Sequence, residues 1–520
     1  MSSRQSSRPA VTVAAGILAS RLIGLVRGLV FARYFSTSAA ADAFTAALRI
    51  PNLLQNLFGE GVLSASFIPV YAGLLAQGER DRARRVAGAV LALLALVVSV
   101  LVLVGVLATP WLIELIAPGF AGATRELTVR LVRILFPGAG ILVLSAWCLG
   151  ILNSHRRFFL SYVSPVIWNV AIIAALLVYG PGSALDQLAV TAAWGSVVGC
   201  ALQFLVQVPT VLRLTGGVRP VLDVASEHVR TVVRSFMPAF VGRGAYQLSA
   251  YADMWLASKV AEGAVAALGY AQNVYMLPVS LFGMAVSAAE LPAMSSAMGS
   301  EHERSAYLRT RLDGGLRQIA YFVVPSAMAF AALGHVIAGV LYRGGRFGDA
   351  QSRYVWIILA GSGVGLLAST LGRLYSSTYY ALKDTRTPLR FALVRVALTI
   401  LLGYAAALML PDLLHVERRW GAAGLTASAG VAGWVEFALL RSRLNRRIGV
   451  TGLPAALLLR LWSAAAIAAG AGWAVLLATP ALGVRVGGLL VLGTFGAVYV
   501  LTTYAFGVAH ARTFLGRLAR

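Results

Sequence analysis

The sequence predicts an all-α polytopic membrane protein with about fourteen transmembrane helices, in two pseudo-symmetric six-helix lobes followed by two C-terminal helices. Three observations predict this class. Hydrophobic residues occupy 59% of the 520 positions and charged residues only 12%, about half of the charged share usual in soluble domains. Long apolar blocks alternate with short polar loops along the whole chain. A motif of the first half also recurs in the second half.

Charge and cysteine content narrow the class further. The net charge is +24, but the arginines are spread in small groups over many loops, which is typical of membrane orientation and not of a nucleic-acid surface. We therefore expect no nucleic-acid partner. Cys148 and Cys200 lie in apolar stretches without metal-ligand spacing, so we expect no cofactor. The polar, basic start of the chain lacks a cleavage site and predicts a retained first helix.

Apolar blocks bounded by turn signals define the expected spans in order. The first half contains spans near 10–35, 41–78, 86–109, 126–152, 159–180 and 187–212. The second half contains spans near 236–258, 264–297, 315–340, 353–381, 389–410 and 419–441. Two more follow near 454–478 and 485–508. These spans divide the chain into an N-lobe (1–213), a C-lobe (214–450), and a last part (451–520) with two helices and a tail.

Basic residues gather in alternate loops, which predicts the orientation of the chain. The basic loops are 80–85, 156–157, 383–390 and 441–447. With both tails included, the side of the N-terminus carries about 25 Lys and Arg against about 8 on the other side. We therefore expect a multi-pass protein of the cytoplasmic membrane with both termini in the cytoplasm.

An internal repeat predicts the two lobes. Leu57-Phe58-Gly59 recurs as Leu281-Phe282-Gly283, each with a proline on both sides, and residues 151–156 parallel residues 381–386. Six spans return the chain to its starting side, so both lobes run in the same direction. Duplications of this length are typical of transporters whose halves rock about a binding site between them.

The first expected helix carries two arginines at membrane depth. Arg21 lies near its middle, and Arg27 follows about a turn and a half later, beyond Ser20 and Gly24. An arginine in mid-bilayer costs roughly 2.5–3.5 kcal/mol on insertion scales, so water or an anion must receive it. The alternatives are snorkelling to the interface or a structural ion pair.

The second expected helix has one polar face. At 100° per residue, Asp42, Arg49 and Glu60 fall close together on a straight helix. Pro51 removes an interior hydrogen bond, and Gly59 and Gly61 weaken the following turns. This pattern favours a helix that bends as a cavity opens, the alternative being a permanently kinked helix with a hydrated seam.

Several motifs together resemble the opening signature of a known family, the lipid II flippases of the MurJ (MviN) family. These motifs are Ser20-Arg21-x-x-Gly24-x-x-Arg27, Ala41-Asp42-Ala43-Phe44, Arg49-Ile50-Pro51-Asn52 and Gly59-Glu60-Gly61. Later segments resemble the family in the same order, at 117–120, 150–153, 342–347 and 379–388. The resemblance therefore covers essentially the whole chain.

The resemblance implies a fold and a function. The fold is that of the multidrug/oligosaccharidyl-lipid/polysaccharide exporters, with two lobes, two extra helices and a cationic central cavity. The function is that of a flippase in peptidoglycan synthesis and cell-wall biogenesis, not an enzyme, in the inner membrane of a bacterium. Its substrate is lipid II, undecaprenyl-pyrophosphate carrying a disaccharide pentapeptide, moved to the outer leaflet by alternating access. Membrane lipids are expected partners, with a coupling cation or the membrane potential as energy source.

The resemblance also implies the site. Expected substrate-binding residues are Ser20, Arg21, Arg27, Asp42, Arg49, Asn52, Gln55, Glu60 and Asn273. Expected hinge residues are Gly24, Pro51, Gly59 and Gly61. A guanidinium matches diphosphate oxygens and keeps its charge, so Arg21, Arg27 and Arg49 are expected to bind, while Asp42 and Glu60 orient them or close the gate.

The sequence departs from the family pattern at positions that are usually charged. Gln55 and Asn56 replace basic residues, Gly28 replaces an acidic residue and Asn273 replaces an arginine. A possible second cationic set is Arg243, Arg373 and Arg395, each of which could instead pair with Asp253, Glu290 or Glu436. Asp253 is a possible cation ligand matching a site in some relatives, but Thr399 and Gly403 occupy the other positions, and we assign no metal site.

Two other functions remain open on sequence alone. One is another polyprenyl-linked oligosaccharide or drug exporter of the same superfamily, although a drug exporter favours acidic and aromatic cavity residues over arginines. The other is a membrane-embedded glycosyltransferase. Such an enzyme needs paired carboxylates or a histidine beside a large loop, whereas the six histidines are scattered and the loops are short. We therefore assign no catalytic residue.

Overall fold

The structure, a computed structural model of the chain, describes residues 7–223, 226–296, 298 and 300–512. The side chains of residues 7–18, 60, 238–239 and 241–250 lie outside the described part. Helix accounts for 87% of the chain and no strand occurs among the described residues, which confirms the all-α prediction. The chain forms two compact units, unit 1 (Met1–Ser258) and unit 2 (Lys259–Arg520).

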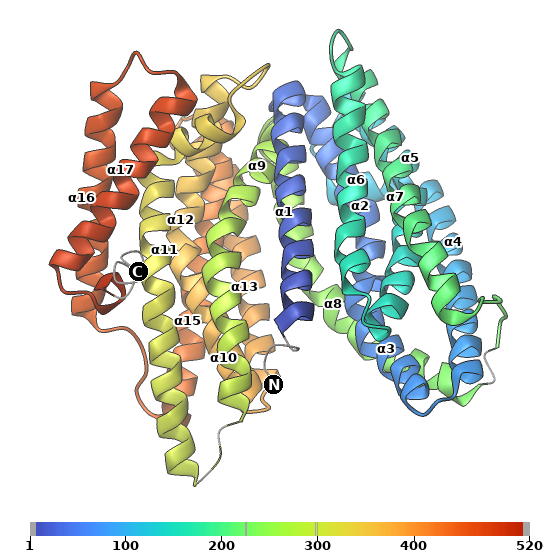
Figure 1. Cartoon of the computed structure of the whole chain (residues 1–520). Coiled ribbons are helices and arrows are strands. Elements are labelled where there is room, and N and C mark those ends of the chain that lie inside the picture. The colour runs from blue at the N-terminus through green and yellow to red at the C-terminus, as the bar shows by residue number, and fades with distance from the viewer. Residues whose placement is uncertain (1–6, 224–225, 297, 299, 513–520) are drawn as a thin grey trace. The chain divides into compact units, whose positions relative to one another are not determined.

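Unit 1 is built from long helices joined by short turns (Figure 1). They are α1 (Ser7–Phe35), α2 (Ala39–Phe58), α3 (Glu60–Ala76), α4 (Arg80–Ile116), α5 (Gly122–Ser154), α6 (Phe158–Tyr179), α7 (Leu185–Thr215) and α8 (Glu227–Val260), whose last residues belong to unit 2. Helix α1 packs on α6, and α5 packs on α2, α4 and α7. The predicted lobe boundary at 213–214 comes before α8, and the predicted lobes stay a prediction.

Unit 2 has the same character, with two π-helical segments inside its spans. Its elements are α9 (Ala264–Pro278), η1 (Val279–Met284), α10 (Ala285–Ser295), α11 (Glu301–Tyr342), α12 (Asp349–Ala381), α13 (Arg386–Tyr404), η2 (Ala405–Met409), α14 (Leu410–Leu413), η3 (Arg418–Trp420), α15 (Gly421–Ile448), α16 (Ala455–Ala478) and α17 (Val484–Ala505). The Tyr499 hydroxyl of α17 donates to the Tyr321 carbonyl of α11 at 2.6 Å. This hydrogen bond joins α17 to α11, on which both α16 and α17 pack.

Twelve segments among the described residues are long and apolar enough to cross a membrane. The α2–α3, α9–α10 and α13–α14 segments each count as one span. Helices α1 and α8 are not among the twelve, although their 29 and 34 residues exceed the roughly 20 that a span requires. The multi-pass helical class is thus confirmed, and the number of fourteen spans stays a prediction.

Buried polar side chains join three helices of unit 1. Gln207 on α7 donates to Ser145 of α5 at 3.0 Å and to Ser164 of α6 at 2.6 Å. Gln203 donates to the same Ser145 at 3.1 Å. In an apolar surrounding such bonds fix the relative rotation of helices that have no hydrophobic driving force to associate. They fix α6 and α7 relative to α5, and α6 in turn packs on α1.

Candidate functional site

Arg27 lies on α1 against an aromatic side chain of α6. Its Cζ is 4.9 Å from the centre of the Trp168 ring. Trp168 is itself fixed, because its Nε1 donates to Ser196 Oγ on α7 at 2.9 Å. Arg27 Nη1 is buried and has no hydrogen-bond partner among the described side chains and main chain. The ring thus holds the guanidinium by a cation–π contact, which leaves a donor available for an anionic ligand.

The other α1 residues of the predicted site differ in exposure. Arg21 is exposed, whereas Ser20 and Gly24 are partly buried. The helix runs from Ser7 to Phe35 without interruption, and a Cβ at Gly24 would meet no neighbouring atom. The described contacts therefore place Arg27, not Arg21, against α6, and hinge motion at Gly24 stays a prediction.

Asp42 lies in the first turn of α2. Ser38 caps this helix, since its hydroxyl accepts from the Ala41 amide at 3.2 Å. Asp42 is only 2% exposed. The partial positive charge of a helix N-terminus stabilises a carboxylate at this position. The fold thus buries a carboxyl group at the start of the helix that carries Arg49.

Arg49 is in contact with α8. The Tyr251 hydroxyl donates to the Arg49 carbonyl oxygen at 3.0 Å. The Asp253 carboxylate, also on α8, attracts the Arg49 guanidinium. Arg49 and Asp253 thus form the second charged group of the candidate site. Among the described residues, no set of three or more His, Cys, Asp or Glu is placed to hold a metal ion.

The predicted hinge in helix 2 coincides with a break in the backbone. The helix passes through Pro51 and ends at Phe58, Gly59 adopts φ −86° and ψ −154°, and α3 begins at Glu60. A Cβ at Gly59 would overlap the Gln55 carbonyl oxygen, so this conformation requires glycine. Gly61 lies in the first turn of α3.

The remaining polar positions of helix 2 lie along its length. Asn52 and Gln55 are partly buried, and Asn56 is exposed. The side chain of Glu60 lies outside the described residues. Its predicted place on one face with Asp42 therefore stays a prediction. Any gating role of these side chains belongs to the proposal below.

The possible second cationic set separates into different environments. Arg395 on α13 pairs with Glu436 on α15 at 3.1 Å, one of the structural pairs considered from sequence. Glu290 pairs instead with Arg311 at 2.9 Å. The exposed residues Arg373 and Asn273 belong to unit 2, and Asn273 interacts with the hydroxyl of Tyr342. The side chain of Arg243 lies outside the described residues.

Sequence patterns did not indicate Trp168, Ser196 or Tyr251. Each acts through a neighbour that is far away in the sequence, since Trp168 lies between Arg27 and Ser196 and Tyr251 contacts Arg49. No spacing rule connects such positions. A tryptophan facing a charged helix is recognised only once the helices are packed.

Solved structures with low sequence similarity share this fold. An inward-facing multidrug resistance MATE family transporter of the MOP superfamily matches with a TM-score of 0.66 and 17% identity, over 84% of this chain and 98% of that chain. A lipid II flippase MurJ in an inward closed conformation matches with a TM-score of 0.78 and 22% identity, over 95% and 98%. The fold therefore defines a multi-pass α-helical membrane protein with the architecture of these transporters.

Sequence comparisons define the family within that class. The family model for lipid II flippase MurJ matches residues 31–492. A lipid II flippase MurJ of Burkholderia cenocepacia is 32% identical over 85% of this chain and 84% of that protein. A probable lipid II flippase MurJ of Bdellovibrio bacteriovorus is 31% identical over 97% and 94%. The chain belongs to the lipid II flippase MurJ family.

Proposed function

We propose that this protein moves lipid II across the inner membrane of a bacterium, from the cytoplasmic to the outer leaflet. Family membership supports this substrate. The observation that carries the proposal is the state of Arg27, a permanent positive charge inside an apolar helix, held on Trp168 with a buried donor available. The diphosphate of the substrate supplies the acceptor oxygens that this donor requires.

The two charged groups of the candidate site, Arg27 on Trp168 and Arg49 with Asp253, have different parts in this proposal. Arg27 binds the diphosphate directly, because its only described partner is an aromatic face that leaves its charge uncompensated. Arg49 is already attracted by Asp253, so it joins the ligand by exchanging that partner for phosphate oxygens. Arg21 is exposed and adds positive charge to the route of entry.

The break at Gly59 suits the conformational part of the cycle. Helices α2 and α3 meet at one residue, so α2 can turn with Arg49 and Asp42 while α3 stays packed on α4 and α5. We propose that this turn closes the site behind the headgroup as alternating access proceeds. In this proposal Asp42 and Glu60 orient the arginines or close the gate by changing ion pairs with them.

The orientation and the energy source complete the proposal. Both termini lie in the cytoplasm, in agreement with the excess of basic residues in the loops on that side. The membrane potential drives one step, since moving a unit charge through 100 mV is worth about 2.3 kcal/mol. A coupling cation is the alternative, which an ion-replacement experiment in proteoliposomes distinguishes.

Complementation in a bacterium depleted of its own flippase tests the proposal. Lipid II exposed outside the cell is measured for the wild type, Arg27→Ala and Arg27→Lys. We expect export by the wild type, loss of export in Arg27→Ala, and partial export in Arg27→Lys, because an ammonium keeps the charge without the planar fork. Arg85→Ala, at the exposed start of α4, is the matched control and retains export.

Two results would contradict the proposal. If the wild type is well expressed but exposes no lipid II, lipid II is excluded as the substrate. If Arg27→Ala exports as much lipid II as the wild type, Arg27 is excluded as a binding residue, whereas lipid II remains the substrate.

A further inference from the structure

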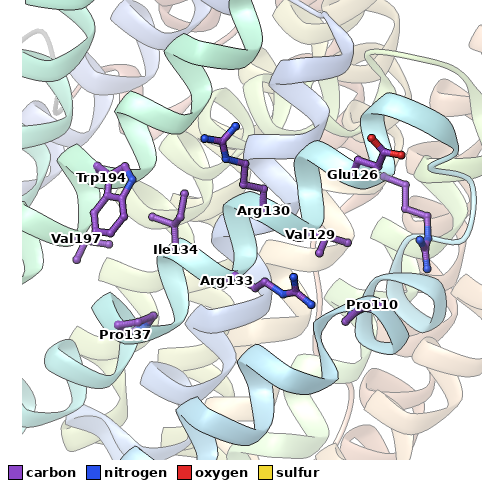
Figure 2. Close-up of a pocket in the computed structure, with 10 residues that line it drawn as sticks. Pro110, Glu126, Val129, Arg130, Arg133, Ile134, Pro137, Trp194 and Val197 are labelled. Atoms are coloured by element: carbon purple, nitrogen blue, oxygen red, sulfur yellow. The ribbon is translucent and has the colours of Figure 1, made fainter.

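A groove lies between α4, α5 and α7 of unit 1, away from the charged groups described above. Its volume is about 630 Å³ and its wall carries three arginines on α5. Figure 2 shows Arg130 and Arg133 on successive turns, with Trp194 and Val197 to one side and Pro110 to the other. The lining residues are Pro110, Arg125, Glu126, Val129, Arg130, Arg133, Ile134, Pro137, Trp194 and Val197.

The groove carries uncompensated positive charge. Arg125, Arg130 and Arg133 take part in no ion pair among the described side chains, and Glu126 is the one carboxylate among the lining residues. The N-terminal end of α5 adds partial positive charge near Arg125. The net charge of this wall therefore attracts an anion.

Some arginines in the connections of unit 2 have carboxylate partners. Arg343 pairs with Asp349 at 2.8 Å, and Arg418 pairs with Asp412 at 2.9 Å. The arginines of the groove have no such partner among the described side chains, although Glu126 stands one turn before Arg130 in the favourable order for a helical ion pair. Their partner is therefore to be sought outside the chain.

Packing contacts give the depth of the groove in the membrane. A Cβ at Gly105 of α4 would overlap the Phe136 ring, and a Cβ at Gly138 would lie 3.4 Å from Val197 Cγ2. Arg133 is thus close in level to Trp194 of α7, and Arg130 is close in level to Trp111 of α4. Both tryptophans face outward, 55% and 72% exposed. Exposed tryptophans mark the interface between hydrocarbon and headgroups.

The groove also opens toward lipid. On α4, Leu107 lies one turn from Trp111 and is 64% exposed, and on α7, Val198 lies one turn from Trp194 and is 52% exposed. Such side chains on both flanks are those of a lipid-facing surface. The part of α5 that follows Arg133 is apolar, beginning with Ile134. A molecule in this groove thus meets positive charge at headgroup level and apolar surface below it.

We propose that the groove of α4, α5 and α7 binds the phosphate group of an anionic membrane lipid, in the leaflet next to the loop of residues 117–121. Arg130 and Arg133 hold the phosphate oxygens, with Arg125 at the rim, because guanidinium groups match phosphate geometry. The acyl chains lie along Ile134 and Val197. A free phosphate gains nothing from those apolar side chains, so the combination favours a lipid.

Native mass spectrometry of the purified full-length protein in detergent tests this site. Binding of phosphatidylglycerol is compared with binding of phosphatidylcholine, each with and without added inorganic phosphate. We expect the wild type to prefer phosphatidylglycerol and Arg130→Ala/Arg133→Ala to bind it about tenfold more weakly. Arg85→Ala/Arg304→Ala removes two exposed arginines elsewhere and leaves the binding of this lipid within about twofold.

A second variant keeps the test decisive if the double variant folds poorly. Glu126→Gln removes the carboxylate from the wall, and we expect it to strengthen binding of phosphatidylglycerol. Equal binding of this lipid by the wild type, Arg130→Ala/Arg133→Ala and Glu126→Gln overturns the proposal. Displacement of the lipid by inorganic phosphate at equal concentration also overturns it, because the site is then one for free phosphate.

Discussion

The two copies of the repeated motif have different backbones. In unit 1, Leu57-Phe58-Gly59 ends one helix, and the next begins at Glu60. In unit 2, Leu281-Phe282-Gly283 lies inside a π-helix of six residues, and the chain stays helical on both sides. At both copies of the motif the chain thus departs from a regular α-helix, but the departure takes a different form in each unit.

The glycines of the two motifs face different neighbours. A side chain on Gly59 would overlap the carbonyl oxygen of Gln55 on its own helix. A side chain on Gly283 would lie 3.0 Å from Thr370 Cγ2, a methyl group of α12. The constraint at Gly59 therefore comes from the main chain, and that at Gly283 from a neighbouring side chain. The helix is interrupted only at Gly59, on the helix that carries Asp42 and Arg49.

The largest effect is expected from Gly59→Ala. The clash is with main chain, so the turn between α2 and α3 must change, at a cost of about 3 kcal/mol. We expect a lowered melting temperature of the purified protein and no complementation of flippase depletion. No substitution of the Gln55 side chain should rescue it. Wild-type stability in Gly59→Ala would show that the main chain at this turn does not require glycine.

The charged groups of the two units provide the second comparison. Arg27 rests on an aromatic ring, whereas Arg395 is neutralised by Glu436. Trp168→Leu removes the cation–π contact, and we expect about tenfold slower lipid II export, equal to about 1.4 kcal/mol, with the melting temperature nearly unchanged. Trp168→Phe keeps an aromatic face and should retain more export. Equal export by both variants would exclude the positioning role of Trp168.

Substitution of the ion pair Arg395–Glu436 in unit 2 should lower the stability of the protein, whereas substitution of Trp168 should lower export. Arg395→Gln leaves the largely buried Glu436 without its partner, so we expect a lower melting temperature. Arg395→Gln/Glu436→Gln should recover most of that loss, because no unpaired charge remains. Additive effects of the two substitutions would mean that the pair contributes nothing as a unit.

A smaller effect is expected from Gly283→Ala. The added methyl group meets the Thr370 methyl group, which can shift, so the loss of stability should be about 1 kcal/mol. Thr370→Ser removes that methyl group and should restore the melting temperature of Gly283→Ala. If Thr370→Ser does not restore the melting temperature, the loss of stability in Gly283→Ala arises from the π-helix itself and not from the contact with Thr370.

Much of the fold could be predicted because membrane spans depend on local composition. The expected span at 126–152 lies within α5, and the basic turn after it is where the helix ends. The backbone of span 41–78 could not be predicted in the same way. A helix tolerates Pro51 by losing one hydrogen bond, whereas the break at Gly59 depends on how α2 and α3 pack separately.

Only the charged residues of the candidate site could be predicted from the sequence. Arg27, Asp42 and Arg49 are conspicuous because charge is costly within a span. Their partners are not, since Trp168 is 141 positions from Arg27 and Tyr251 is 202 from Arg49. Whether an arginine serves a ligand or an acidic neighbour depends on these distant contacts.

The smallest effect is expected from the turns that end α5 and α12. His155 follows α5, and its Nε2 and the Tyr71 hydroxyl are 3.1 Å apart. Burial, together with the charges of Arg80 and Arg157, lowers the pKa of His155 below its ordinary value of 6.5. The neutral ring therefore stabilises the folded turn above about pH 6.5, and this contribution is lost as the pH falls toward the lowered value.

The corresponding turn of unit 2 should not respond in that range. At Asp384 burial acts to raise the pKa, but hydrogen bonds from Thr387 and the pairing with Arg447 outweigh it and bring the pKa below 3.8. Its contribution is present above about pH 4 and is lost only in stronger acid. Amide hydrogen exchange between about pH 7.5 and pH 5.5, corrected for intrinsic rates, should show weakening protection after α5 and steady protection after α12. His155→Gln should abolish that difference, and a difference that persists would assign the pH response to another group.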